Sequence, residues 1–185
     1  MNCRKFFESI AGDAQYCKKL QQSPEDIQVA WEKESASEHS LLPAQDVEIL
    51  ARQVMDPTHY DNVTGNIAPT LFDDASSKGA SCHRMGYITR EKIREIAEAR
   101  VSLVNQNPPS TGPRKAIGFT TLYVSEVRSV FSKTLPVRRA AGVYDTAKAD
   151  DISHADICQL VSGKENGKSV RAQLFMLAMA RLEVF

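Results

Sequence analysis

The chain has no excess of charge of either sign. Its 185 residues include 23 Lys and Arg against 23 Asp and Glu, so the formal net charge is zero. A neutral chain creates no overall field that would recruit DNA, RNA or an anionic membrane. Aromatic residues make up only 7%, which leaves few platforms for base stacking. No apolar run approaches the roughly 20 residues that span a bilayer. Nucleic-acid binding is therefore not favoured, and no membrane segment is predicted.

Cysteine is scarce and scattered. The four cysteines form no CxxC pair, whereas small secreted domains held by disulfides are usually shorter and denser in cysteine. The segment Met1–Glu8 contains a basic pair, but Glu8 and Asp13 follow too early for the apolar part of a signal peptide. We expect free thiols and a cytoplasmic location.

Signatures of nucleotide binding and catalysis are missing. The turn Gly163–Ser169 ends in Gly-Lys-Ser like a phosphate-binding loop, but only three residues separate its glycines where four are needed. The serine nucleophile motif GxSxG and the zinc motif HExxH are also absent. No cofactor and no metal ion are predicted.

What the chain does have is a 42% share of hydrophobic residues, enough to build the core of one ordinary domain. Residues 1–40 show helical spacing of apolar side chains and are predicted to form a helical extension. Residues 41–185 combine strand-like and helical patterns, which predicts a single α+β domain. We expect a small mixed sheet flanked by helices.

Several elements of this domain follow from local patterns. Thr89 is expected to cap a helix over residues 89–104, whose apolar residues recur at helical spacing. β-branched and aromatic residues predict a strand over residues 116–124. Residues 46–55 fit either a helix or a strand. The remaining predictions are a helix capped by Ser23, short strands at 67–72, 82–88 and 138–144, and a closing helix at 169–182.

The densest polar stretch is Asp145–Ile157, which places four aspartates around His154. Ser153 could cap a helix that begins at His154, with Asp156 in its first turn. One interpretation is a metal site or a histidine–aspartate proton relay. The other is an acidic helix start with a buried histidine. No second histidine follows at helical spacing, so a metal site is disfavoured.

A second candidate is the segment Ser81–Arg84, where Cys82 precedes His83. A catalytic thiol needs a base beside it, but neighbours on a strand point to opposite faces. Cys82 then shares one side with Arg84, and Ser81 shares the other with His83. We expect Cys82 to be a small buried apolar side chain.

Arginine is the more frequent basic residue in the globular part. Its planar guanidinium group suits phosphate and carboxylate ligands, and basic residues concentrate at Arg114–Lys115 and Arg138–Arg139. Ordinary surface ion pairs are the alternative interpretation.

Four pieces of the chain resemble a family of small bacterial domains, mostly uncharacterised and often found near mobile or defence-associated genes. The pieces are Glu48–Val54, Phe72, Gly79–Arg84 and Ser153–Ile157, and the resemblance spans residues 48 to about 182. It implies no particular activity. It does imply that five residues belong to one grouped site, namely Arg52, Phe72, Ser81, Arg84 and His154.

The function predicted from these features is that of a non-catalytic accessory protein of a bacterial or phage system, which binds a protein partner. The alternative is a protein that binds a small nucleotide or phosphate-containing ligand, or an enzyme acting on one, with Arg52, Arg84 and His154 as the contacting residues. The alternative requires these three side chains to converge in one concave polar site.

Overall fold

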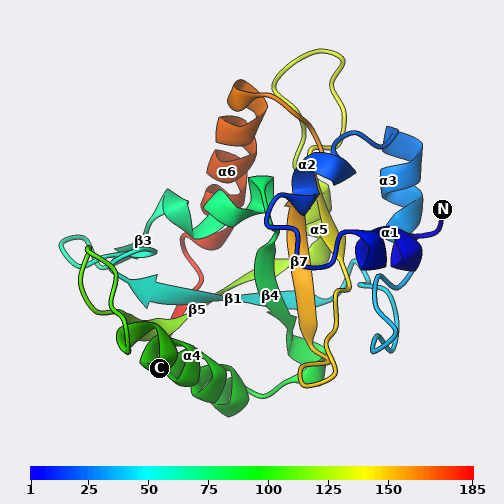
Figure 1. Ribbon diagram of the computed structural model, residues 1–185. Helices are drawn as coiled ribbons and strands as arrows, with labels where there is room; N and C mark the ends of the chain where they lie inside the picture. The colour runs from blue at the N-terminus through cyan, green and yellow to red at the C-terminus, as the bar shows by residue number, and fades with distance from the viewer.

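The structure, a computed structural model, describes residues 1–185 and has the α+β class predicted from the sequence (Figure 1). Six strands form one sheet in the order β6–β7–β4–β1–β5–β8, and β2 and β3 form a separate hairpin. Every strand pair is antiparallel, so the sheet is not mixed. None of the helices combines the length and the apolar character needed to cross a lipid bilayer.

The strands are β1 (Ile49–Asp56), β2 (Tyr60–Asp61), β3 (Asn66–Ile67), β4 (Ala80–Arg84), β5 (Lys115–Tyr123), β6 (Ala141–Tyr144), β7 (His154–Gln159) and β8 (Leu182–Val184). The helices are α1 (Cys3–Ser9), α2 (Tyr16–Leu20), α3 (Glu25–Trp31), α4 (Arg90–Asn105), α5 (Val124–Arg128) and α6 (Lys164–Ala178), with the 3-10 segments η1 (Pro69–Ser76) and η2 (Met85–Tyr87).

One face of the sheet carries the main hydrophobic core. Alternate residues of each strand point to this face, as the pleat of a β-strand requires; Leu50, Cys82 and Ile157 are examples. The other side of this core comes from helices α5 and α6 and from the segment η1. In α6, for example, Val170 and Leu174 are part of the core. We call this the α6 face.

The opposite face has two separate covers (Figure 1). Helix α4 covers β1 and β5, where Ile93 packs against Ala51 and Phe119. Apolar side chains of α1 to α3 form a second cluster with Tyr144 of β6 and Cys158 of β7. The first 40 residues thus pack against the sheet. The polar residues of β4 and β7 on this face belong to neither apolar cluster.

Two predicted elements match the structure closely. Helix α4 begins after Thr89, whose hydroxyl oxygen accepts the backbone N–H of Lys92 at 3.2 Å. Strand β5 covers residues 115–123 and pairs with β1 along its length. The ambiguous residues 46–55 contain all of that partner strand except its last residue, since β1 runs from Ile49 to Asp56.

The helix predicted to begin at His154 does not exist, because residues 154–159 form strand β7. This strand is paired on both sides, with β4 and with β6. Ser153 does not cap a helix. Its backbone N–H and its hydroxyl both donate to the Asp151 carboxylate, which orders the connection into β7. Pairing with two neighbouring strands outweighs the local helix-start signal.

Other boundaries also differ. Helix α6 begins at Lys164, five residues before the predicted cap Ser169, and follows Gly163, whose φ of 97° suits glycine. Helix α3 starts after Pro24 and not after a Ser23 cap. Most of residues 67–72 is 3-10 helix, because Pro69 lies at the start of η1 and cannot donate to a strand ladder.

Candidate functional site

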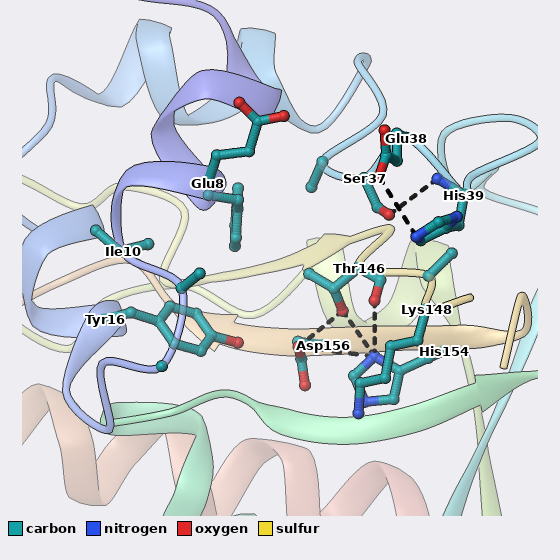
Figure 2. A pocket seen from close by; sticks show the side chains of 15 residues that line it. Glu8, Ile10, Tyr16, Ser37, Glu38, His39, Thr146, Lys148, His154 and Asp156 are labelled. Carbon is teal, nitrogen blue, oxygen red and sulfur yellow. Dashed lines mark hydrogen bonds and ion pairs between the residues drawn. The ribbon is translucent and has the colours of Figure 1, made fainter. Parts of the chain in front are cut away.

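A pocket of about 390 Å³ lies where the N-terminal segment meets the start of β7. Its floor is formed by Thr146, His154 and Asp156, and Lys148 lies beside them. The walls come from residues far away in sequence: Phe7 and Tyr16 on one side, and the loop 37–39 on the other. Figure 2 shows His154 and Asp156 next to each other, with the Tyr16 hydroxyl directed toward Asp156. We call this the His154 pocket.

The hydrogen bonds of His154 fix its tautomer. The ring nitrogen Nδ1 lies 3.1 Å from the backbone oxygen of Thr146 and 2.9 Å from its hydroxyl oxygen. A carbonyl oxygen can only accept, so Nδ1 carries the proton. Burial lowers the pKa of His154 below its usual value, which favours the neutral ring. The other nitrogen, Nε2, then presents a lone pair, and this buried atom has no hydrogen-bond partner.

Asp156 is the second group on the floor. Its Oδ2 accepts the Thr146 hydroxyl at 2.7 Å, whereas its buried Oδ1 has no partner. The side chains of His154 and Asp156 are only 8% and 7% exposed. A buried polar atom without a partner costs free energy. Two buried, unsatisfied hydrogen-bond acceptors therefore belong to His154 and Asp156, which line the pocket and lie two residues apart on one strand face.

The wall beside Asp156 depends on Gly79. This glycine has a φ of 75°, and a Cβ atom there would clash with the Tyr16 hydroxyl and lie 2.9 Å from the Asp156 Cβ. Burial raises the pKa of Tyr16 well above its usual range, so its phenol stays protonated. Gly79 thus lets the Tyr16 ring close the pocket against the sheet.

A second histidine lies directly opposite His154 in the register of β4 and β7. The Nδ1 atom of His83 lies 3.2 Å from an Asp151 oxygen and 3.1 Å from the Ser153 hydroxyl, and its Nε2 lies 3.1 Å from the Gln53 amide. Burial by itself would raise the pKa of Asp151, but hydrogen bonds from His83 and Ser153 lower it well below its usual range. Both ring nitrogens of His83 are occupied within the protein.

Arg84 does not approach the His154 pocket. It lies on the α6 face and is 1% exposed. Its guanidinium group contacts both Glu48 oxygens at 2.7 and 2.8 Å, Asp145 at 3.0 Å and the Leu42 carbonyl at 2.7 Å. Burial raises the pKa of Asp145 to about 6, although the charge of Arg84 opposes this shift. These donors are already used, so Arg84 has none to offer a phosphate.

Arg52 is engaged in the same way. It donates to the backbone oxygens of Leu71 and Ser81, the latter at 2.7 Å, and lies 3.7 Å from Asp74. Phe72 is in the main core. Arg52 thus contacts the backbone of Ser81, whose side chain lies on the opposite face of the sheet, and none of Arg52, Phe72 and Ser81 lines the His154 pocket. The convergence of Arg52, Arg84 and His154 does not occur, because alternation places the two arginines on the other face of the sheet.

Nucleophilic and metal chemistry find little support in these side chains. All four cysteines are free and buried, and burial raises the pKa of the Cys82 thiol to about 12. A thiol in this state is a poor nucleophile. No group of three or more His, Cys, Asp and Glu side chains is arranged to hold a metal ion.

A scan of protein-family models finds no match to this chain, and searches of curated proteins and of solved structures find none either. The sequence analysis grouped His154 with the aspartates around it, Asp156 included, but placed them in a helix start and did not identify Thr146 or Tyr16 as neighbours of the pair. The available signal was the two-residue spacing of His154 and Asp156, which places both on one face only if the segment is a strand.

Proposed function

We propose that this protein binds a small organic ligand in the His154 pocket, through Asp156 and His154. The observation that supports this function is the pair of buried, unpartnered acceptors, His154 Nε2 and Asp156 Oδ1, on the floor of a pocket of about 390 Å³. A ligand site is usually a concave pocket with a few well-placed polar groups. Of the residues expected from the sequence to form a site, His154 remains a proposed ligand contact, whereas Arg52 and Arg84 are assigned structural roles.

An orphaned ring nitrogen alone does not make a site, as His59 shows. Its Nδ1 is also buried and unpartnered, yet His59 lines neither the His154 pocket nor the cavity of about 580 Å³ beside α5 and α6. In the His154 pocket, two unsatisfied acceptors, a cavity and two aromatic walls occur together. This combination is what distinguishes a ligand site from a packing defect.

The test is a titration with small-molecule fragments, in which binding is monitored through the ring ¹⁵N resonances of the four histidines. Fragments that bind in the pocket should shift the signals of His154 and His39, which line it, and leave those of His59 unchanged. The variant His154→Ala should weaken binding of such fragments while keeping its folded spectrum. The proposal would be refuted if no fragment of the library shifted the His154 signals. It would also be refuted if fragments shifted the His39 signals of His154→Ala with the same affinity as in the wild-type protein.

Binding of a protein partner is the second candidate function. The surface that favours it is an open groove between α5 and α6, lined by Val130, Met176 and Leu177 and by small polar residues. Phe131 and Met176 are 49% and 65% exposed. A flexible methionine such as Met176 on a grooved apolar surface suits an amphipathic helix of a partner.

Photo-crosslinking from position 176 in cells tests this second function. The crosslinked partner should be lost in Ala172→Glu, because Ala172 is exposed and lines the groove, so the new charge would lie within it. Position 168, exposed on the same helix, is the matched control. Equal crosslinking from both positions, or crosslinks only to a second copy of this chain, would contradict the helix-binding function.

A further inference from the structure

The formal charges around the His154 pocket are unbalanced. Three carboxylates, from Glu8, Glu38 and Asp156, line it against one ammonium group, that of Lys148. With neutral histidines, the pocket therefore carries two net negative charges, although the whole chain is neutral. A concave site of one charge sign raises the local concentration of ligands of the opposite sign.

The hydrogen-bonding groups on the floor point to the same ligand chemistry, independently of the charge count. His154 Nε2 and Asp156 Oδ1 are both acceptors, and both side chains are more than nine-tenths buried. Two acceptors require a ligand with N–H or O–H donors. A phosphate or carboxylate ligand would bring acceptors against acceptors and a negative charge against the buried Asp156.

The walls accept an organic cation. Phe7 and Tyr16 form an edge-to-face pair with ring centroids 5.8 Å apart, and both line the pocket. Aromatic faces attract ammonium and guanidinium groups, more strongly where water is excluded. A bare metal ion fits less well, because the floor offers only two ligand atoms and Lys148 lies beside them.

We propose that the ligand of the His154 pocket is an organic cation with N–H donors, namely a protonated amine, amidine or guanidine on a small apolar body. Its N–H groups donate to Asp156 Oδ1 and His154 Nε2, and its apolar body lies against Phe7 and Tyr16. This inference rests on the proposed small-ligand function and specifies the chemical class of the ligand.

Three probes of nearly the same shape test the class. Benzamidine is a cation with N–H donors, benzamide is a neutral N–H donor, and benzoate is an anion. Titrations of the full chain, followed by the His154 ring ¹⁵N signals, should give benzamidine an affinity at least tenfold above that of benzamide. Benzoate should cause no shift of His154.

Two aspartate-to-asparagine variants locate the effect. Asp156→Asn should reduce the preference for benzamidine over benzamide by at least tenfold, because the carboxylate that pairs with the cation is gone. Asp150→Asn is the matched control, since Asp150 is exposed in the connection before β7 and does not line the pocket. It should leave the preference unchanged.

The outcomes separate the two proposals. If no probe and no library fragment shifts His154, the small-ligand function itself fails. If benzoate or phenyl phosphate binds in the pocket and benzamidine does not, the pocket is a ligand site but the cation class is wrong. Equal benzamidine preference in Asp156→Asn and in the wild-type protein also overturns the class.

Discussion

Two buried polar clusters lie on opposite faces of the same sheet and differ in how completely they are paired. On the α6 face, the Arg84 guanidinium contacts Glu48, Asp145 and the Leu42 carbonyl. On the other face, His154 and Asp156 share one threonine and keep one unpartnered atom each. The first cluster is closed and the second is open.

The difference indicates different roles. A buried charge is tolerated when it is paired and hydrogen-bonded, and removing one partner then leaves the other uncompensated. The Arg84 cluster fits this description and stabilises the fold. The His154–Asp156 pair faces a pocket, and its unpaired acceptors cost stability that a ligand would recover. The predictions below test this contrast, beginning with the closed cluster.

Replacing Arg84 should have the largest effect. Arg84→Met keeps much of the side-chain volume but leaves Asp145 and Glu48 without their partner, and we expect the free energy of unfolding to fall by about 3–5 kcal/mol. Urea unfolding measures this. The control is Arg94→Met, which breaks an exposed ion pair with Glu98 and should cost less than about 0.5 kcal/mol. Similar losses in both variants would show that the Arg84 cluster is not a stabilising unit.

Gly79→Ala should have the next largest effect. The new Cβ would meet the Tyr16 hydroxyl and Asp156 at a backbone φ that disfavours alanine, so we expect a loss of about 2–4 kcal/mol. Gly12→Ala is the control, since Gly12 has a φ of 79° and nothing lies within 4 Å of the position that a Cβ atom would take there. The excess loss in Gly79→Ala measures how tightly Tyr16 closes the pocket. Equal losses would mean that the wall yields freely.

His59 provides a buried, unpartnered histidine outside the pocket. Burial, followed by the charges of Arg52, Arg100 and Arg114, lowers its pKa from 6.5 to about 3. Below pH 6.5 the histidine takes up a proton in the unfolded chain but not in the folded protein. The free energy of unfolding therefore decreases as the pH is lowered from 6.5 to 3. At pH 5 this contribution is about 2 kcal/mol.

The variant His59→Gln isolates this contribution. On going from pH 7 to pH 5, the stability of the wild-type protein should change by about 2 kcal/mol more in the destabilising direction than the stability of His59→Gln does. The comparison with the variant is necessary because Asp145 has its pKa raised to about 6 and acts in the opposite direction over this range. His39→Gln, which replaces an exposed histidine, is the matched control. An unchanged slope in His59→Gln would contradict the prediction.

The sequence predicted elements whose signals are local and long. The helix after Thr89 has a cap and four turns of apolar spacing, and the strand over residues 116–124 has a run of β-branched and aromatic residues. The prediction from the sequence was wrong at the start of β7, where Ser153, His154 and Asp156 have the pattern of a capped helix. There, pairing with β4 and β6 decides the conformation, and these partners are distant in sequence.

That error placed His154 and Asp156 on different sides of an expected helix. Residues two apart lie on nearly opposite sides of a helix but on the same face of a strand, so His154 and Asp156 meet only in β7. The walls of the pocket could not be predicted either, because Tyr16 belongs to residues 1–40, which were predicted to form a helical extension. The strand alternation proposed for Cys82 and Arg84, by contrast, correctly put both on one side.

The smallest expected effect concerns the open cluster itself. In Asp156→Asn the amide oxygen still accepts the Thr146 hydroxyl, and no under-paired carboxylate remains, so stability should change by less than about 1 kcal/mol, in the stabilising direction. Asp151→Asn makes the matched comparison, because the Asp151 carboxylate is fully used by Ser153 and His83. It should cost about 1–2 kcal/mol. Urea unfolding at pH 7 compares the two variants. If Asp156→Asn destabilises the protein as much as Asp151→Asn does, Asp156 belongs to the closed, structural class, and the contrast between the two faces is lost.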